Sequence, residues 1–167
     1  MPRTAKNWAA TFLALSVLFL FFSPGLAFAM IVTLPFPDLV RESNAIVIAR
    51  VSDKVPVPKG AKEFPQIKNI LTVERVLKGK LQTSQPLELM TADTQGKWME
   101  DVLAFPDKGT RVVLFLARGK DGNLNIVNGI QGVWPLQDGT DKTLGMGFRY
   151  SIEQIKKEIQ TQSRASG

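Results

Sequence analysis

The alternation of hydrophobic and polar residues is most regular in residues 69–79 (NILTVERVLKG). Apolar residues alternate with polar ones at the start of this segment, as in a β-strand with one face exposed to water. The pattern then slips because two apolar residues are adjacent, which predicts a β-bulge near Glu74 and Arg75. Gly79 can adopt a positive φ and is expected to end the strand. We therefore predict a long, bent strand with a neighbour on each side, in the middle of a small barrel.

Other segments also have the hydrophobic pattern of β-strands. Residues 45–51 (AIVIARV) are apolar on both faces at first and alternate from Arg50 onward, which is typical of a strand that leaves the core at one end. Residues 111–117 (RVVLFLA) are the most hydrophobic and are expected to be buried on both faces. A hairpin turn follows them, with Asp121 and Gly122 as the expected positive-φ pair. The remaining predicted strands are residues 86–92, 124–127 and 132–136.

Two connections between the predicted strands lack a regular pattern. Residues 55–66 (VPVPKGAKEFPQ) contain prolines and a glycine that do not suit a central strand, so we predict a loop or a splayed hairpin tip. Residues 93–106 are predicted to be irregular, with at least one aromatic residue, Trp98 or Phe105, covering the open end of the core. Such connections are the parts of a barrel that are free to contact another molecule.

Helical signals lie near the two ends of the mature chain. A short helical turn is predicted over residues 39–43, with Asp38 as its N-cap. Ser151 followed by Gln154 forms a capping box, and isoleucines recur at helical spacing from residue 152. These isoleucines form one narrow apolar stripe, so the C-terminal helix is expected to lie across the barrel or to meet a partner. Residues 160–167 are expected to fray.

The composition narrows the range of functions. The chain has 167 residues, of which 44% are hydrophobic and 22% charged, as expected of one globular domain. It has no cysteine, which excludes disulfides, thiol nucleophiles and cysteine-ligated metal sites. It also has no histidine, which excludes serine triads with histidine and zinc-water hydrolysis as usually built. No cofactor is expected.

The N-terminal segment has the pattern of an export signal. Arg3 and Lys6 provide positive charge, an apolar run follows over residues 9–22, and a small-x-small sequence ends at Ala29. We predict cleavage after Ala29, so that residues 1–29 are a signal peptide and the mature protein is periplasmic or extracellular. The alternative is an uncleaved membrane anchor, but the apolar run is shorter than the roughly 20 residues that span a bilayer. Membrane contact is therefore expected only through this segment, before cleavage.

The order of the predicted segments carries a resemblance. SNAIVIARV, a proline-rich gap, LTVERVLKG, an L-x-L strand and GTRVVLFLA with a glycine hairpin follow one another over roughly residues 38–127. This order resembles the netrin-like modules, OB-fold-type barrels that include the tissue inhibitors of metalloproteinases, and it is similar to numerous uncharacterised exported bacterial domains. The resemblance implies a Greek-key β-barrel. Those inhibitors chelate the protease metal through an N-terminal cysteine, so the absence of cysteine argues against inhibition by that route.

Carboxylates are the remaining candidates for catalysis or metal binding. Glu100 and Asp101 could serve as an acid–base pair, but adjacent residues of a strand point to opposite faces, and we interpret them as exposed loop charges. Asp138 and Asp141 could offer oxygens to a calcium ion. The further alternating ligands of an EF-hand loop are missing, so we interpret this segment as a solvated turn. The sequence therefore predicts a protein that is not an enzyme.

Candidate partner-binding residues lie in the two irregular connections. Lys59, Lys62 and Phe64 form a mildly cationic tip with an apolar centre, which could dock on an acidic protein, a cell-wall polymer or phospholipid headgroups; a solvated loop is the alternative. Trp98 is the second candidate, as an exposed anchor or as a lid on the core. Nucleic acid is not an expected partner, because basic residues are interleaved with acidic ones and strand aromatics are few.

Together these patterns predict a mainly β protein. We expect a small OB-fold-like Greek-key β-barrel with a short N-terminal helix over residues 30–150, followed by a C-terminal helix and tail over residues 151–167. We predict an exported, non-enzymatic binding or interaction module, with an inhibitory module as one form of it, for an unidentified extracytoplasmic protein or cell-envelope polymer. The alternative is an accessory domain or subunit of an extracytoplasmic hydrolase. Binding of single-stranded nucleic acid or polysaccharide is less favoured.

Overall fold

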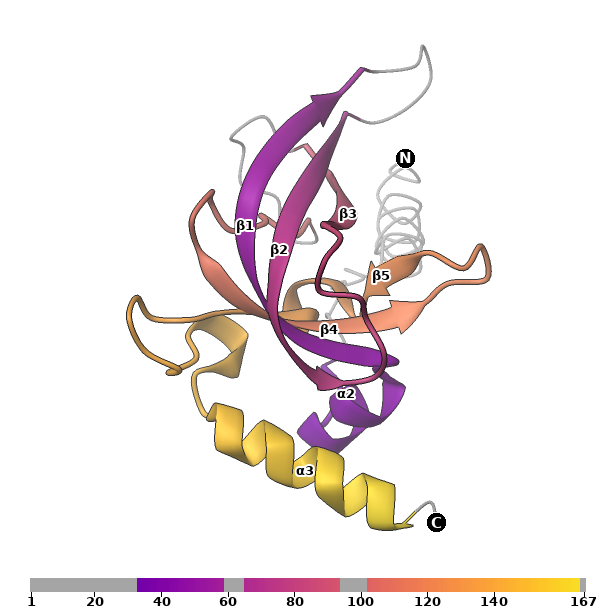
Figure 1. The fold of residues 1–167 in the computed structure, drawn as a ribbon, viewed down its shortest axis with the longest axis vertical. Helices are drawn as coiled ribbons and strands as arrows, with labels where there is room; N and C mark the ends of the chain where they lie inside the picture. Colours follow the sequence, from indigo (N-terminus) through magenta and orange to yellow (C-terminus); the bar gives the residue numbers. More distant parts are fainter. Residues whose placement is uncertain (1–32, 59–64, 94–101, 166–167) are drawn as a thin grey trace, which may run out of the picture. The chain divides into compact units, whose positions relative to one another are not determined.

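The computed structural model describes residues 33–58, 65–93 and 102–165, all within the unit Val32–Gly167. This unit is mainly β, with a short helix before an antiparallel sheet and a longer helix after it (Figure 1). Within the described residues, no helix is both long and apolar enough to cross a membrane. In chain order the elements are α2 (Phe36–Glu42), β1 (Ala45–Val57), β2 (Gln66–Lys78), β3 (Leu87–Ala92), β4 (Arg111–Arg118), β5 (Leu124–Ile126), η1 (Gly129–Gly132), β6 (Val133–Pro135), η2 (Gly145–Gly147) and α3 (Ile152–Ala165).

The centre of the sheet is β1, which pairs with β2 on one side and with β4 on the other. The strand order is β3-β2-β1-β4-β5, and β6 also pairs with β4. The predicted bulge in β2 is confirmed, because Ala49 and Ile48 of β1 pair with Val73 and Arg75 and leave Glu74 as the extra residue. The predicted neighbours on both sides of β2 are also confirmed, since β3 pairs with its other edge.

Gly79 directly follows β2 and has a φ of +83°, as predicted. A Cβ at this position would also overlap the carbonyl oxygen of Asn44. Glycine is therefore required here both by its conformation and by the close approach of another part of the backbone.

The first strand is longer than its sequence predicts, because β1 continues to Val57 and includes Pro56. β4 pairs with β1 only up to Arg50, and beyond that point the described partner of β1 is β2. Proline is tolerated there because, among the described strands, none pairs with that edge of β1 to accept a hydrogen bond from a backbone N–H. The prediction of a loop from residue 55 is thus wrong, and its alternative, a splayed hairpin, describes the region better (Figure 1).

Hydrophobic clusters cover both faces of β1 and β4. Alternate residues of a strand point to opposite faces, so Val47 and Leu114 belong to one cluster while Ile48 and Phe115 belong to the other. The first cluster also contains residues of β2 and β3, together with Phe105. The burial of Phe105 confirms that an aromatic residue of the irregular connection covers the core.

The two helices cover the second cluster. Leu39 and Val40 of α2 and Ile152 and Ile155 of α3 are buried in it. The apolar stripe of the C-terminal helix therefore lies against the sheet, which is one of the two predicted outcomes. The helix itself runs to Ala165 rather than fraying from residue 160.

The starts of the two helices can be compared with their predicted N-caps. Ser151 N–H donates to Gln154 Oε1 at 2.7 Å, and Gln154 N–H donates to Ser151 Oγ at 3.2 Å, which confirms the capping box. Helix α2 begins earlier than predicted, with Pro35 as its N-cap, and Asp38 lies in the first turn, paired with Arg41. Pro37 also lies in the first turn, where proline has no N–H to leave unpaired and its φ is already helical.

The hairpin turn between β4 and β5 differs from its prediction at one residue. Gly122 has a φ of +81°, but Asp121 is not among the described residues with positive φ. The Asp121 carboxylate instead accepts hydrogen bonds from the backbone N–H of Asn123 at 3.1 Å and from its Nδ2 at 2.8 Å. Side chain to backbone bonding of this kind forms the turn without a left-handed residue.

Candidate binding groove between the edge strands

A groove of about 340 Å³ lies between the two edge strands of the sheet. Residues 89–92 of β3 line one side of it, and residues 124–126 of β5 line the other. Val102 and Leu103, from the last part of the irregular connection, complete the lining together with Gly129. Closure of the sheet into a barrel stays a prediction, because within the described residues β3 and β5 are not paired with each other.

The backbone of β3 presents to this groove groups that have no partner strand within the described residues. Asp93 N–H donates to Pro65 O at 2.8 Å. This bond, with the strand register, identifies which residues of β3 direct their backbone groups toward β2. In an antiparallel pair, successive residues direct their backbone groups alternately toward and away from the partner strand. The N–H and C=O groups of Met90 and Ala92 therefore point away from β2, and both residues line the groove.

The backbone of β5 also directs N–H and C=O groups toward the groove, from the side opposite β3. Gly119 N–H donates to Asn123 O, and Val127 N–H donates to Phe115 O, so the residues between them alternate in the same way. The backbone groups of Leu124 and Ile126 therefore point away from β4, and both residues line the groove. The groove is thus flanked by hydrogen-bonding edges of two strands.

The inner surface of the groove is apolar. Leu89 is buried in the first hydrophobic cluster, and Leu103, Leu124 and Ile126 pack against that cluster. An apolar surface between two polar backbone edges is suited to an extended peptide, whose own backbone is polar and whose side chains alternate.

Asn69 lies beneath this region and is fully buried. Its Nδ2 donates to Thr91 Oγ1 at 2.9 Å and to Leu89 O at 3.2 Å, which ties β2 to the part of β3 that lines the groove. Its Oδ1 is buried and has no hydrogen-bond partner within the described residues. A buried acceptor without a partner costs about 1–3 kcal/mol. Sequence analysis did not single out this residue, although its one signal is a polar residue in phase with Leu71 and Val73.

The predicted partner-binding residues, Lys59, Lys62, Phe64 and Trp98, lie outside the described residues. Two lysines at the base of the same hairpin are described, and both have partners within the protein. Lys54 Nζ donates to Phe105 O at 3.0 Å and lies 3.6 Å from the carboxylate of Asp107. Lys68 Nζ lies 3.0 Å from the carboxylate of Glu88 on β3.

The predicted carboxylate candidates do not form a site within the described part of the chain. Glu100 and Asp101 lie outside it. No group of three or more histidine, cysteine, aspartate or glutamate residues that could hold a metal is found among the described residues. Asp141, one of the two candidate calcium ligands, accepts hydrogen bonds from Arg75 at 2.9 Å and from Arg111 at 3.3 Å.

These arginines belong to an ion-pair network on the outer surface of the sheet. Glu74, the bulged residue of β2, accepts from Arg50 at 3.0 Å and from Arg111 at 2.9 Å. Burial raises the pKa of Glu74, but the hydrogen bonds and positive charges of the two arginines outweigh it and hold the pKa below its ordinary value. A hydrogen bond from Arg75 is the main cause that lowers the pKa of Asp141. We assign this network a structural role, since it ties the turn that contains Asp141 to the sheet.

The strand aromatics are not available for stacking on a base. Phe115 and Trp134 are buried in the second cluster, with ring centroids 4.5 Å apart. Trp134 Nε1 also donates to Gln131 O at 2.7 Å. These rings therefore serve the core.

Comparison with known proteins gives no family for this chain. A scan against protein-family models finds no match, and a search of curated protein sequences finds none either.

Proposed function

We propose that this protein is an exported, non-enzymatic binding module that takes up an extended segment of an extracytoplasmic protein at the free edge of β3. The signal peptide proposed for residues 1–29 would deliver it outside the cytoplasm. An inhibitor-like role is one form of this activity, in which the segment belongs to another active protein.

The observation that supports the proposal is the groove between β3 and β5. Met90 and Ala92 direct backbone groups into it that no described strand pairs with, and its inner surface is apolar. Addition of a strand to such an edge gains main-chain hydrogen bonds, while alternate side chains of the peptide contact the apolar surface. A strand rises about 3.3 Å per residue, so the lined part of β3 can pair with about four residues of a peptide.

The strand order supports an OB-like arrangement as part of the same proposal. The two ends of the order, β3 and β5, both line one groove, as expected when a sheet curls toward a cylinder. OB-type barrels are five-stranded and partly open. We propose that the seam of this barrel is the binding site rather than the hairpin tip alone.

A peptide-display selection with matched variants tests this proposal. Met90→Pro removes a backbone N–H that points into the groove, whereas Met90→Val changes the same side chain and keeps the N–H. Peptides selected on the wild-type protein should alternate apolar and polar residues. They should bind Met90→Val with unchanged affinity and bind Met90→Pro about tenfold more weakly, the equivalent of one hydrogen bond.

Circular dichroism and thermal unfolding establish that both variants are folded. If the selected peptides bind folded Met90→Pro as well as wild type, or if proline-rich peptides are selected instead, strand addition at β3 is the wrong mechanism.

A further inference from the structure

Three large apolar side chains are exposed on the η2 loop, which we define as residues 144–148. Leu144, Met146 and Phe148 are exposed, and Phe148 keeps 62% of its surface accessible. Apolar residues exposed singly are ordinary, but three in one turn form a patch that requires an explanation. This patch does not belong to the groove proposed above, since none of the three side chains lines it.

The η2 loop is held firmly with these side chains outward. The Thr143 hydroxyl lies 2.6 Å from Gly147 O and within hydrogen-bond distance of Tyr150 O, so the two carbonyl oxygens share its one proton. Gly147 N–H donates to Leu144 O, and Gly147 packs directly against the buried ring of Trp134. The exposure of the apolar side chains is therefore a property of the fold, because these hydrogen bonds and the packing of Gly147 against Trp134 hold the loop backbone in place.

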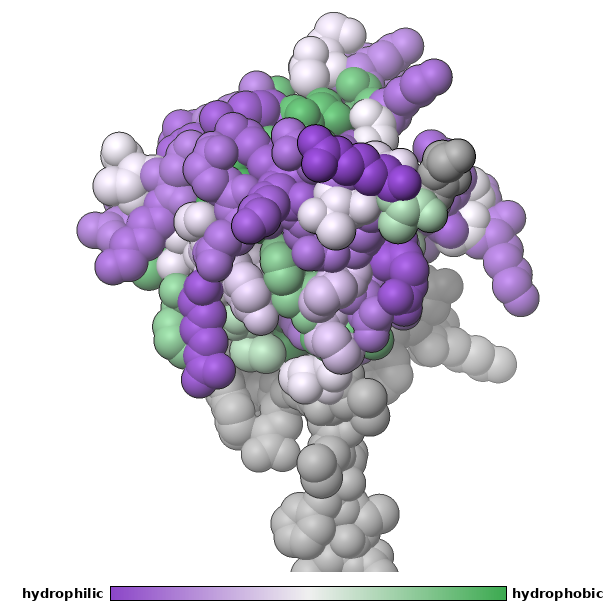
Figure 2. All heavy atoms as spheres, turned by 90° about the horizontal axis from the view of Figure 1, so that it is seen from below, coloured by the Kyte–Doolittle hydropathy of each residue, from purple (hydrophilic) through white to green (hydrophobic). Residues whose placement is uncertain are grey.

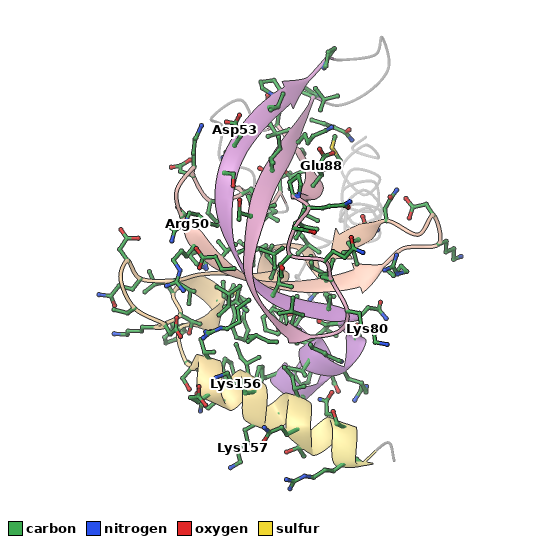
Figure 3. The ribbon with its side chains drawn as sticks, viewed as in Figure 1. Arg50, Asp53, Lys80, Glu88, Lys156 and Lys157 are labelled. Carbon is green, nitrogen blue, oxygen red and sulfur yellow. The ribbon has the colours of Figure 1, made fainter. Side chains whose placement is uncertain are left out.

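Basic residues flank the patch on both sides in the sequence. Lys142 and Arg149 are exposed, and neither has an ion-pair partner among the described residues. The Arg149 guanidinium lies 5.2 Å from the ring centroid of Phe148, so positive charge is adjacent to the most exposed apolar side chain. Lys157 of α3 points away from the sheet (Figure 3).

We propose that the η2 loop docks on an anionic lipid surface, with Leu144, Met146 and Phe148 entering the interface and Lys142 and Arg149 contacting headgroups. Peripheral membrane binding of this kind combines apolar insertion with electrostatic attraction to anionic lipids. The proposal goes beyond the sequence-based expectation that only the signal segment contacts a membrane. It is independent of peptide binding at the seam.

The composition of the patch favours lipid over a second copy of the chain. An isologous dimer formed through the η2 loop would bring Lys142 and Arg149 close to their own copies, with no acidic group of the loop to offset them. Three side chains are also far fewer than the roughly 20–30 residues per side of a stable protein interface. Seen from the side of α3, the surface is mostly hydrophilic, and hydrophobic residues are exposed in small groups between polar ones (Figure 2).

A single introduced cysteine gives a direct test, because the chain has none of its own. The exported protein carrying Leu144→Cys, labelled with an environment-sensitive fluorophore, should shift its emission to the blue when phosphatidylglycerol–phosphatidylcholine vesicles are added. The same label at Val55→Cys, an equally exposed apolar position on β1, should not shift. Phosphatidylcholine vesicles alone should give little change with either label.

Cosedimentation with the same vesicles measures what each group contributes. Met146→Ser with Phe148→Ser should abolish binding to anionic vesicles, whereas the control Val55→Ser, at an exposed apolar position outside both proposed sites, should leave it unchanged. Arg149→Gln should weaken it about fivefold, as for the loss of one positive charge at an anionic surface. Equal binding to neutral vesicles, or binding that survives in the Met146→Ser, Phe148→Ser variant, would overturn the proposal. So would a wild-type dimer in sedimentation analysis that this variant abolishes.

Discussion

Replacement of Gly147 by alanine tests the packing that holds the η2 loop on the sheet. A Cβ at this position would lie less than 3.0 Å from ring carbons Cγ, Cδ2 and Cε3 of Trp134. The indole cannot move aside freely, because three aromatic rings surround it. Its ring centroid lies 5.9 Å from that of Phe36, 4.5 Å from that of Phe115 and 5.5 Å from that of Tyr150. The added methyl group must therefore displace either the loop backbone or a buried aromatic cluster.

The expected cost follows from this geometry. Overpacking a well-packed core by one methylene group costs typically about 1–3 kcal/mol. Three ring atoms are affected at once, and the hydrogen bond from Trp134 Nε1 to Gln131 O resists rotation of the indole. We therefore expect Gly147→Ala to lower the free energy of unfolding by about 3 kcal/mol, which corresponds to a fall in Tm of about 10 °C for a domain of this size.

Urea and thermal unfolding followed by circular dichroism measure this change. Gly119→Ala is the matched control, since its added Cβ would come close only to the ends of two exposed side chains, Asn125 and Asp121, and would lie at an ordinary van der Waals distance from the backbone oxygen of Asn123. That variant should change stability by less than about 1 kcal/mol. The double variant Gly147→Ala, Trp134→Phe should be more stable than the sum of the two single effects, because the smaller ring relieves the overlap. Strictly additive effects, or a Gly147→Ala protein as stable as the control, would show that the loop yields and that the packing argument is wrong.

Three further predictions concern charge, capping and a backbone contact. Glu74→Gln combined with Asp141→Asn should make the free energy of unfolding depend less on pH at acidic pH. The folded-state pKa of each carboxyl is lowered, so each ionised carboxylate adds to the free energy of unfolding, by at most about 1 kcal/mol, and does so fully above about pH 4.5. This contribution is lost as the pH falls through the lowered pKa. Urea unfolding midpoints measured down to about pH 3 would reveal the loss. Ser151→Ala should cost about 1 kcal/mol by removing the acceptor for the Gln154 N–H, measured by urea unfolding. Gly79→Ala should cost at least about 2 kcal/mol, since it combines a positive φ with overlap on a backbone carbonyl, and its effect on Tm should clearly exceed that of Ser151→Ala.

The local elements could be predicted because their causes are local. Glu74 follows an alternating run that breaks at adjacent apolar residues, and the bulge occurs at that residue. Ser151 and Gln154 are three residues apart and satisfy each other's backbone N–H. Pro56 was misleading because proline excludes a central strand but not a strand edge, and the sequence does not tell where β1 loses its second neighbour.

The groove could not be predicted from the sequence, because its parts are brought together by the whole topology. Met90 and Leu124 have no shared pattern, and what makes them important is that their backbones face the same space. Asn69 has a signal in its phase with Leu71, but its meaning depends on contact with Thr91, a residue of another strand. Lys59 and Trp98 were chosen as candidates for the charge or aromatic character of their side chains. This groove, in contrast, is flanked largely by main-chain groups, which side-chain type does not reveal.

The path of β1 explains why the two edges of the sheet come to face each other. Up to Arg50, β1 pairs with both β2 and β4, and beyond Val51 it pairs with β2, whose other edge is taken by β3. The extra residues Ser52 and Glu74 lie close to this change of partner, one on each strand of the pair, and bulges increase the local twist of a ribbon. A strongly twisted β1–β2 ribbon rotates β3 away from the plane of β4 and toward β5. Removal of either bulge would therefore flatten the sheet and separate β3 from β5, so the predicted bulge at Glu74 and the bulge at Ser52, which was not predicted, together make the groove.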